Sequence, residues 1–222
     1  TKFILRGTFL IEALGAVLLF PVFCRDFGIK GIWMSVFHSI SAFCNAGFDI
    51  LGTTDHTFVS LTGYSRNIWL NIVIMLLIIL GGIGFLTWED FYTNKFKFKR
   101  YRMQSKVILI TTAILIIAPA VFFFACDFGN LPAGKRLLAS VFQSVTTRTA
   151  GFNTEDLSLM TEAGKAVMIL LMLIGGSPSS TAGGMKTTTF AVLILNALAT
   201  FRSREDAGAF GRRFDGQVVK NA

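Results

Sequence analysis

Two short segments that end in the same pattern contain the residues whose types and spacing could do chemistry. One runs from Phe37 to Asp49 and ends in Ala-Gly-Phe-Asp, and the other runs from Phe142 to Asn153 and ends in Ala-Gly-Phe-Asn. Glycine permits the backbone angles that turn carbonyl oxygens to one side, and inward-facing carbonyls can replace the water shell of a cation. Neither turn contains a carboxylate, so we predict coordination by backbone carbonyls rather than by a charged ring. The predicted filter residues are Asn45, Ala46, Gly47, Thr149, Ala150 and Gly151.

Each pattern follows a stretch that can enter a membrane but cannot cross it. As a helix, the stretch from Gly31 to Phe43 would extend ~18–20 Å into a hydrocarbon core of ~30 Å, and the same holds for Leu137 to Thr147. A helix that enters from outside points the partial negative charge of its C-terminus at a cation near the bilayer centre. An alternative is that each glycine is a helix C-cap in an ordinary outer loop. The duplication and the flanking apolar segments favour a re-entrant pore loop.

The composition is that of a membrane protein. Hydrophobic residues make up 53% of the chain and charged residues 15%, and the mean hydropathy is +0.61, far from a soluble domain. The formal charge of +8 comes from basic residues beside apolar segments, which indicates membrane topology and no nucleic-acid partner. The three cysteines show neither a disulfide framework nor a metal motif.

Four long apolar segments are visible, at residues 3–23, 68–86, 107–124 and 166–199. The fourth has 34 residues and would be ~51 Å long as one helix. Proline and glycines interrupt its centre, and a helix broken at membrane depth must lie against protein or water. The second has no charge and is expected to be unbroken, so that only the second half of the chain has a broken helix. The predicted gate loop comprises Gly175, Gly176, Ser177, Pro178, Ser179, Ser180, Thr181, Ala182, Gly183 and Gly184.

An internal repeat organises these segments. Its three ordered anchors are Asp-Phe-Gly at 26–28 and 127–129, Ala-Gly-Phe at 46–48 and 150–152, and Gly-Gly at 81–82 and 175–176. Basic residues precede the first span, separate the second from the third and follow the fourth, which places these three regions in the cytoplasm. The two units are therefore parallel. We predict a first M1–pore helix–M2 unit at 1–94, a basic cytoplasmic linker at 95–106, a second unit at 107–203 and a cytoplasmic tail or linker at 204–222.

These motifs resemble the pore subunit of the Ktr/Trk/HKT superfamily of potassium transporters, and within it the bacterial Ktr type. The residues from Ser41 to Asp49 are similar to the filter of the second of four units, and those from Thr146 to Thr154 to that of the third. Gly175 to Thr189 resembles the third unit's broken M2 helix, whose intramembrane loop gates the pore in that family. The expected fold is thus an all-α membrane protein with two parallel M1–pore helix–M2 repeats and re-entrant filter loops, half of a pseudo-fourfold pore.

The resemblance also implies a setting for the pore. It implies potassium uptake across a bacterial inner membrane by a multi-pass protein, with sodium as an activator and no organic cofactor. Lipid, the remaining M1–pore helix–M2 units or a second copy, a homodimer and a cytoplasmic ring of nucleotide-binding regulatory subunits are the implied partners. Units that resemble the first and the fourth are absent from this sequence, so either they lie elsewhere in a longer chain or two such chains close the pore.

Two basic side chains near the predicted pore need an explanation. Lys186 either biases the pore electrostatically or extends toward the cytoplasmic interface. Arg148 would repel a cation if it faced the filter, so we expect it to point behind the filter and to pair with a carboxylate or with backbone carbonyls. Glu12, inside an apolar span, is one candidate for that carboxylate.

Other residues near the turns have simpler expected roles. We expect His38 to be a packing or capping residue, and Phe48 and Phe152 to wedge the filter against neighbouring helices. Asp49 and Asp55 either concentrate cations at the outer mouth or are solvated loop carboxylates.

Two further classes of protein compete with a pore. An enzyme is disfavoured because the glycine-rich loop has neither the P-loop spacing nor a G-x-S-x-G nucleophile elbow. A secondary cation-coupled transporter, with broken helices and no continuous pore, is the alternative. Such folds often contain inverted repeats, whereas the units here are parallel, which favours a pore.

Overall fold

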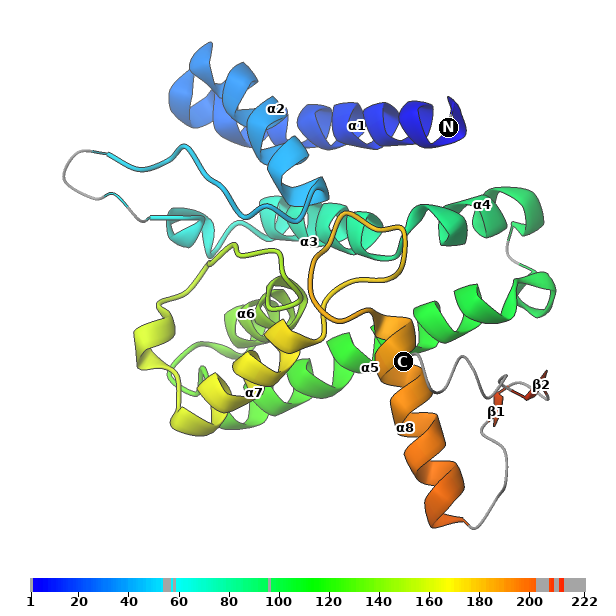
Figure 1. Ribbon diagram of the computed structural model, residues 1–222. Coiled ribbons are helices and arrows are strands. Elements are labelled where there is room, and N and C mark those ends of the chain that lie inside the picture. Colours follow the sequence, from blue (N-terminus) through cyan, green and yellow to red (C-terminus); the bar gives the residue numbers. More distant parts are fainter. Residues whose placement is uncertain are drawn as a thin grey trace.

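The computed structural model describes residues 2–53, 57, 59–95, 97–202, 208–209 and 212–213, and it is built from helices (Figure 1). The predicted tail at 204–222 and Asp55 lie almost entirely outside the described residues. The short remaining elements are the 3-10 helices Thr62–Tyr64, Phe98–Arg100 and Leu157–Leu159, and an antiparallel pair of two-residue strands, β1 (Gly208–Ala209) and β2 (Arg212–Arg213).

The first unit contains four helices, α1 (Lys2–Phe27), α2 (Lys30–Phe43), α3 (Ile68–Gly82) and α4 (Phe85–Asn94). The side chain of Asn67 caps α3 by accepting a hydrogen bond from the backbone N–H of Leu70 at 3.0 Å. The short helix α2 packs against both α1 and α3. The predicted M1–pore helix–M2 order is therefore present.

The second unit repeats this order with α5 (Met103–Cys126), α6 (Ala133–Thr146), α7 (Glu162–Leu173) and α8 (Thr187–Phe201). Thr161 caps α7 through a 3.0 Å hydrogen bond from the backbone N–H of Gly164. The fourth apolar segment is broken between α7 and α8, as the sequence predicts. Figure 1 shows α8 leaving the bundle, with the loop that precedes it beside α3.

The second apolar segment differs from the prediction. It is divided into α3 and α4, whose axes differ by 97° across a short break. The break follows Gly82, and Gly84 has a φ of +85°, a conformation that glycine adopts without penalty. The expectation of an unbroken second span was wrong, because a charge-free apolar run does not prevent a turn that glycines allow.

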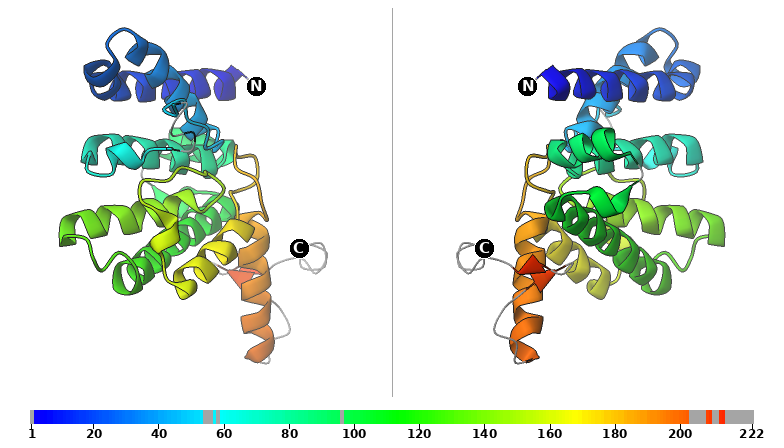
Figure 2. Two further views of the ribbon diagram at one scale, coloured as in Figure 1. Left: turned by 90° about the vertical axis from the view of Figure 1, so that its left-hand side faces the viewer. Right: turned by 90° about the vertical axis from the view of Figure 1, so that its right-hand side faces the viewer.

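Two of the described helices, α1 and α5, are long and apolar enough to cross a membrane, or three spans if α3 and α4 count as one. Figure 2 shows α3 between the α1–α2 pair and the second unit. A buried cluster that includes Phe43, Ile74, Phe142 and Phe152 joins the units at this level. The core thus surrounds the two predicted filter turns, while α1 and α5 keep large apolar side chains exposed, as lipid-facing helices do.

Candidate functional site

The helices α2 and α6 end at the two predicted filter turns, and both turns have the same pattern of positive φ angles. The φ angles are +51° at Asn45 and +69° at Gly47 in the first turn. They are +69° at Thr149 and +87° at Gly151 in the second turn. A left-handed β-branched residue such as threonine is a rare outlier that costs ~1–3 kcal/mol and persists only where its surroundings impose it. The repeat is therefore a repeat of left-handed backbone positions as well as of sequence, and Thr149 is the strained member of the set.

The two turns meet backbone to backbone. A Cβ atom added to Gly47 would lie 2.3 Å from the carbonyl oxygen of Ala150 and 2.8 Å from Cα of Gly151. A Cβ atom added to Gly151 would lie 3.4 Å from Cα of Gly47. Gly47 has no room for a side chain, and the two predicted filter segments share one location although they are far apart in sequence.

A hydroxyl group holds each turn in the same way. Ser41 Oγ donates to the carbonyl oxygen of Phe48 at 2.8 Å, and Thr146 Oγ1 donates to that of Phe152 at 2.7 Å. These bonds tie the last turn of each short helix to the residue that follows the glycine. Sequence reasoning missed these two residues, although their aligned hydroxyls were a signal.

A second matched pair of hydroxyls fixes each short helix to the long helix before it. Ser39 Oγ donates to the carbonyl oxygen of Glu12 in α1 at 2.7 Å, and Ser144 Oγ donates to that of Ile116 in α5 at 2.6 Å. Each bond joins the middle of a short helix to the backbone of the long helix that precedes it. The short helices are thus held at both their sides and their ends.

The predicted gate loop folds back on itself at its base. The backbone N–H of Gly175 donates to the carbonyl oxygen of Met185 at 3.0 Å, and that of Gly176 donates to Gly183 at 3.1 Å. A Cβ atom at Gly175 would lie 1.7 Å from the carbonyl oxygen of Gly183, so the two arms approach closely only because this residue is glycine. The loop is a compact hydrogen-bonded structure.

The tip of the loop fills the break between α3 and α4. The backbone N–H of Ser177 donates to the carbonyl oxygen of Gly82 at 2.9 Å. In return, the N–H of Phe85, at the start of α4, donates to the carbonyl oxygen of Ser179 at 2.9 Å. The peptide groups that the break exposes are therefore satisfied by the loop of the other unit.

Thr181 connects the loop to the first filter turn. Its Oγ1 donates to the carbonyl oxygen of Phe43 at 2.8 Å and accepts from Nδ2 of Asn45 at 3.0 Å, while its backbone N–H donates to Gly81 at 3.2 Å. Phe43 is the last residue of α2, and Asn45 is in the predicted filter. The loop thus contacts the turn directly.

Arg148 connects the loop to the second turn. Its side chain is 7% exposed, and one guanidinium nitrogen donates to the carbonyl oxygen of Gly175 at 3.2 Å. A pairing with Glu12 was wrong: Glu12 lies beside Cys44, whose Sγ is 3.9 Å from its carboxylate. The predicted alternative, a backbone carbonyl, is the observed partner.

The remaining predicted residues are divided between the core and the surface. Lys186 Nζ donates to the carbonyl oxygen of Ala182 at 3.0 Å, so it folds back onto the loop. His38 is fully buried, with Nδ1 2.8 Å from the carbonyl oxygen of Met34. Phe152 is buried, but Phe48 is 69% exposed, so the wedge prediction was wrong for Phe48 because the described residues place no helix over it. Asp49 accepts from the N–H of Leu51 at 3.1 Å.

Comparisons with known proteins agree with this geometry. The family model described as TrkH, cation transport protein, matches residues 1–222. Potassium/sodium uptake protein NtpJ of Enterococcus hirae is 42% identical over 226 residues, which cover 99% of this chain and 49% of that protein. Ktr system potassium uptake protein B of Bacillus subtilis is 34% identical over 219 residues, 96% of this chain and 48% of that protein.

The fold also has a counterpart among solved structures. The crystal structure of the potassium transporter TrkH from Vibrio parahaemolyticus matches with a TM-score of 0.72 at 17% identity, over 95% of this chain and 45% of that chain. The chain spans about half the length of the relatives that it matches. It is an all-α, multi-pass protein of the plasma membrane, and it belongs to the TrkH family of cation transport proteins.

Proposed function

We propose that this chain forms half of a potassium-uptake pore, with two of four filter segments. The observation that carries the proposal is the pair of turns, alike in φ pattern and in hydroxyl bonds, that meet at Gly47 and Gly151. Backbone carbonyls at such turns can coordinate a dehydrated cation without a fixed charge. The relatives NtpJ and Ktr protein B are named as potassium/sodium and potassium uptake proteins, which supports transport over catalysis.

The proposed filter consists of the backbone at residues 45–47 and 149–151. The short helices α2 and α6 direct their C-terminal ends at these turns, which adds a partial negative potential for a cation. The remaining two segments of a ring would come from the rest of a longer protein or from a second copy. The parallel order of the units disfavours the alternative of a coupled transporter with inverted repeats.

The gate in this proposal is the loop at 175–184. Its contacts with Gly82 and Phe85 join it to the break in the first unit, and those of Thr181 and Arg148 join it to the two turns. Opening requires these bonds to break together or the whole loop to move as one body. Each of these hydrogen bonds contributes ~1 kcal/mol of net free energy. The closed loop is therefore stable, and its opening is reversible.

The proposed cytoplasmic partner is a ring of nucleotide-binding regulatory subunits, in a homodimeric assembly in which sodium promotes uptake. The basic linker at 95–106 supports a contact on this side. Its Arg102 bridges Glu89 at 3.0 Å and Asp90 at 3.5 Å in α4. A partner that pulls on the linker would therefore act on α4, which begins at the residue bonded to the gate loop.

The filter is tested by rubidium uptake and its competition by sodium, in cells that express the complete protein. Gly151→Ser is the variant, and Gly134→Ser is the control, because Gly134 lies at the start of α6 with open space around it. We expect Gly151→Ser to lose potassium preference and Gly134→Ser to keep it. Unchanged preference in Gly151→Ser would reject the filter.

The gate is tested separately with Thr181→Val, which keeps the side-chain shape and removes the hydroxyl that bonds Phe43. Thr188→Val, in the first turn of α8, is the matched control. We expect rubidium flux in the absence of the activating signal to rise about fivefold, the effect of ~1 kcal/mol, with potassium preference retained. A fall in flux, or an equal rise in both variants, would contradict the gate.

A further inference from the structure

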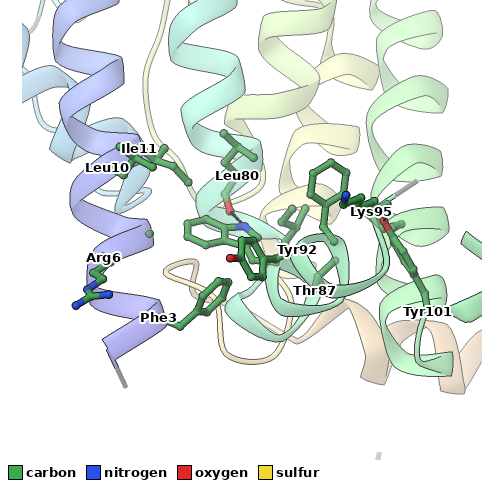
Figure 3. Close-up of a pocket in the computed structure, with 14 residues that line it drawn as sticks. Phe3, Arg6, Leu10, Ile11, Leu80, Thr87, Tyr92, Lys95 and Tyr101 are labelled. Atoms are coloured by element: carbon green, nitrogen blue, oxygen red, sulfur yellow. Dashed lines mark hydrogen bonds between the residues drawn. The ribbon is translucent and has the colours of Figure 1, made fainter. Parts of the chain in front are cut away.

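A large cavity lies in the first unit, with one lining residue from the second unit. Its volume is about 1040 Å³, and α1, the end of α3, α4 and α5 line it (Figure 3). None of the filter or gate-loop residues is among its lining residues. Most of its lining residues belong to the first unit and Leu109 belongs to the second, so it is a crevice that is separate from the proposed filter and gate-loop residues.

The walls of the crevice are mainly apolar and aromatic. Phe3 and Leu10 line it from α1, Trp88 and Phe91 from α4, and Leu109 from α5. The indole Nε1 of Trp88 donates to the carbonyl oxygen of Leu80 at 3.1 Å, so its only donor is satisfied and its ring presents carbon to the cavity. Such a surface suits a hydrocarbon chain better than a polar solute.

Cations lie at opposite sides of this apolar space. Arg6, on the first turns of α1, and Lys95, after the end of α4, both line the cavity and are exposed (Figure 3). Within the part of the chain that the structure describes, neither side chain has a carboxylate partner. The nearby acids Glu89 and Asp90 are already paired with Arg102. The rim is therefore positive.

The position of the crevice gives it a membrane depth. It includes the start of α1 and borders the basic linker, both of which lie on the cytoplasmic side by the distribution of Lys and Arg. Trp88 and Tyr92 in α4 are residues that collect at the level of lipid headgroups. The cytoplasmic leaflet carries the anionic lipids that basic residues attract.

We infer that this crevice binds an anionic phospholipid. One acyl chain lies against Leu10, Trp88 and Leu109, and the phosphate group is held at the rim by Arg6 or Lys95. The inference depends on the topology and not on the filter or the gate. A lipid in this position packs against α4, the helix whose first N–H bonds the gate loop.

Native mass spectrometry of the complete protein tests this site. The protein is released from vesicles of equal phosphatidylglycerol and phosphatidylcholine, and retained lipids are counted. We expect the wild type to retain more phosphatidylglycerol than phosphatidylcholine. Each of the substitutions Arg6→Gln and Lys95→Gln should lower that ratio by about fivefold, and the double variant should lose the preference. Arg66→Gln removes an exposed charge on the outer side as the matched control and should keep the preference.

A second variant tests the apolar part without changing charge. Leu10→Trp adds volume inside the crevice and should lower retention of both lipids while rubidium uptake still shows a folded pore. No preference for phosphatidylglycerol in the wild type would overturn the inference. So would an equal loss in Arg66→Gln, or a cross-link from Leu10→Cys to another protein segment, which would show that protein fills the crevice.

Discussion

The two units of this chain have the same turn but differ in the segment after it. In both, a short helix is followed by a turn with a left-handed residue, an alanine and a left-handed glycine. A hydroxyl of the short helix donates to the carbonyl oxygen of the residue after that glycine. After the turn, the first unit bends by 97° at a short break, whereas the second inserts the loop at 175–184. Both second helices are therefore broken near the paired Gly-Gly anchors, at 81–82 and 175–176.

The two breaks form one structure rather than two. The loop of the second unit supplies the hydrogen-bond partners of Gly82 and Phe85, which the bend of the first unit exposes. A Cβ atom at Gly84 would lie 2.4 Å from the carbonyl oxygen of Pro178, so the contact depends on glycine. The short break and the long loop are complementary, so a substitution in one should change the hydrogen bonds of the other.

The two turns contact this loop through groups of different charge. In the first unit, Phe43 provides a carbonyl acceptor to Thr181. Near the equivalent position of the second unit, Arg148 is a donor to Gly175. The first segment thus contacts the loop through neutral groups, the carbonyl of Phe43 and the amide of Asn45, whereas the second contacts it through a cationic guanidinium, and this difference can be tested.

The largest expected effect is the difference in uptake between variants of Gly47 and Gly151. In Gly47→Ala the new methyl group meets the carbonyl oxygen of Ala150 at 2.3 Å and also strains φ, whereas in Gly151→Ala the nearest contact is 3.4 Å. We expect Gly47→Ala to lower rubidium uptake by about tenfold or more, and Gly151→Ala to have a smaller effect from strain alone. Surface expression, measured in parallel, separates uptake from abundance. Equal losses would show that the two turns are crowded alike.

The next effect comes from the donor in the second unit. Arg148→Gln shortens the side chain and removes the bond to Gly175, so the loop loses one anchor. We expect unregulated rubidium flux to rise about fivefold, from a loss of ~1 kcal/mol. The control is Arg136→Gln in α6, where the guanidinium donates to the carbonyl oxygen of Ala125 at 3.1 Å on the exposed side. Flux that stays at the wild-type level in Arg148→Gln would mean that the loop does not depend on this anchor.

The sequence predicts one part of this comparison well. The short helices, their glycine turns and the broken fourth segment follow from helix length, apolar runs and glycine positions. The sequence predicted the kind of partner that Arg148 has, a carboxylate or a backbone carbonyl, because a buried cation needs an acceptor or an opposite charge beside it. Its identity, Gly175, depends on tertiary packing that local pattern does not contain.

The bend between α3 and α4 could not be predicted from hydropathy. Ile83 and Gly84 lie in an uninterrupted apolar run, so the signal is only the sequence Gly-Gly-Ile-Gly at 81–84. Isolated, that pattern permits a helix or a turn. The turn is stabilised by Ser177 and Ser179, which are far away in the sequence. Long-range hydrogen bonds, not local preference, decide the structure here.

A smaller effect compares the hydroxyls that hold the turns. Ser41→Ala and Thr146→Val each remove one bond to the carbonyl oxygen after the glycine. We expect each to lower stability by ~1 kcal/mol, because each carbonyl loses a hydrogen-bond partner. Thermal unfolding of the purified complete protein measures the change. Thr200→Val, whose hydroxyl bonds Asn196 on the exposed side of α8, should leave the midpoint unchanged. A midpoint that drops equally in all three variants would remove any special role of the turns.

The smallest effect compares the outer ends of the units. Asp26 accepts from the hydroxyl of Tyr64 at 2.8 Å, whereas the aligned Asp127 accepts from Thr161 at 2.9 Å. Partial burial, and then the bond to Asp26, raise the pKa of Tyr64 above its ordinary value of 10.0. Because the folded state keeps this proton more tightly than the unfolded state, the contribution is complete below pH 10 and is lost as the pH rises through the raised pKa.

This pH dependence belongs to the first unit alone, since a threonine hydroxyl does not titrate in the accessible range. Thermal midpoints should therefore fall above pH 10 in the wild type and in Thr161→Val. In Tyr64→Phe that part of the fall should be absent, although the midpoint at neutral pH is lower because the bond to Asp26 is gone. A profile for Tyr64→Phe that runs parallel to the wild type would place the alkaline loss elsewhere. The contacts Tyr64–Asp26 and Thr161–Asp127 would then differ in the side chain that donates and not in their dependence on pH.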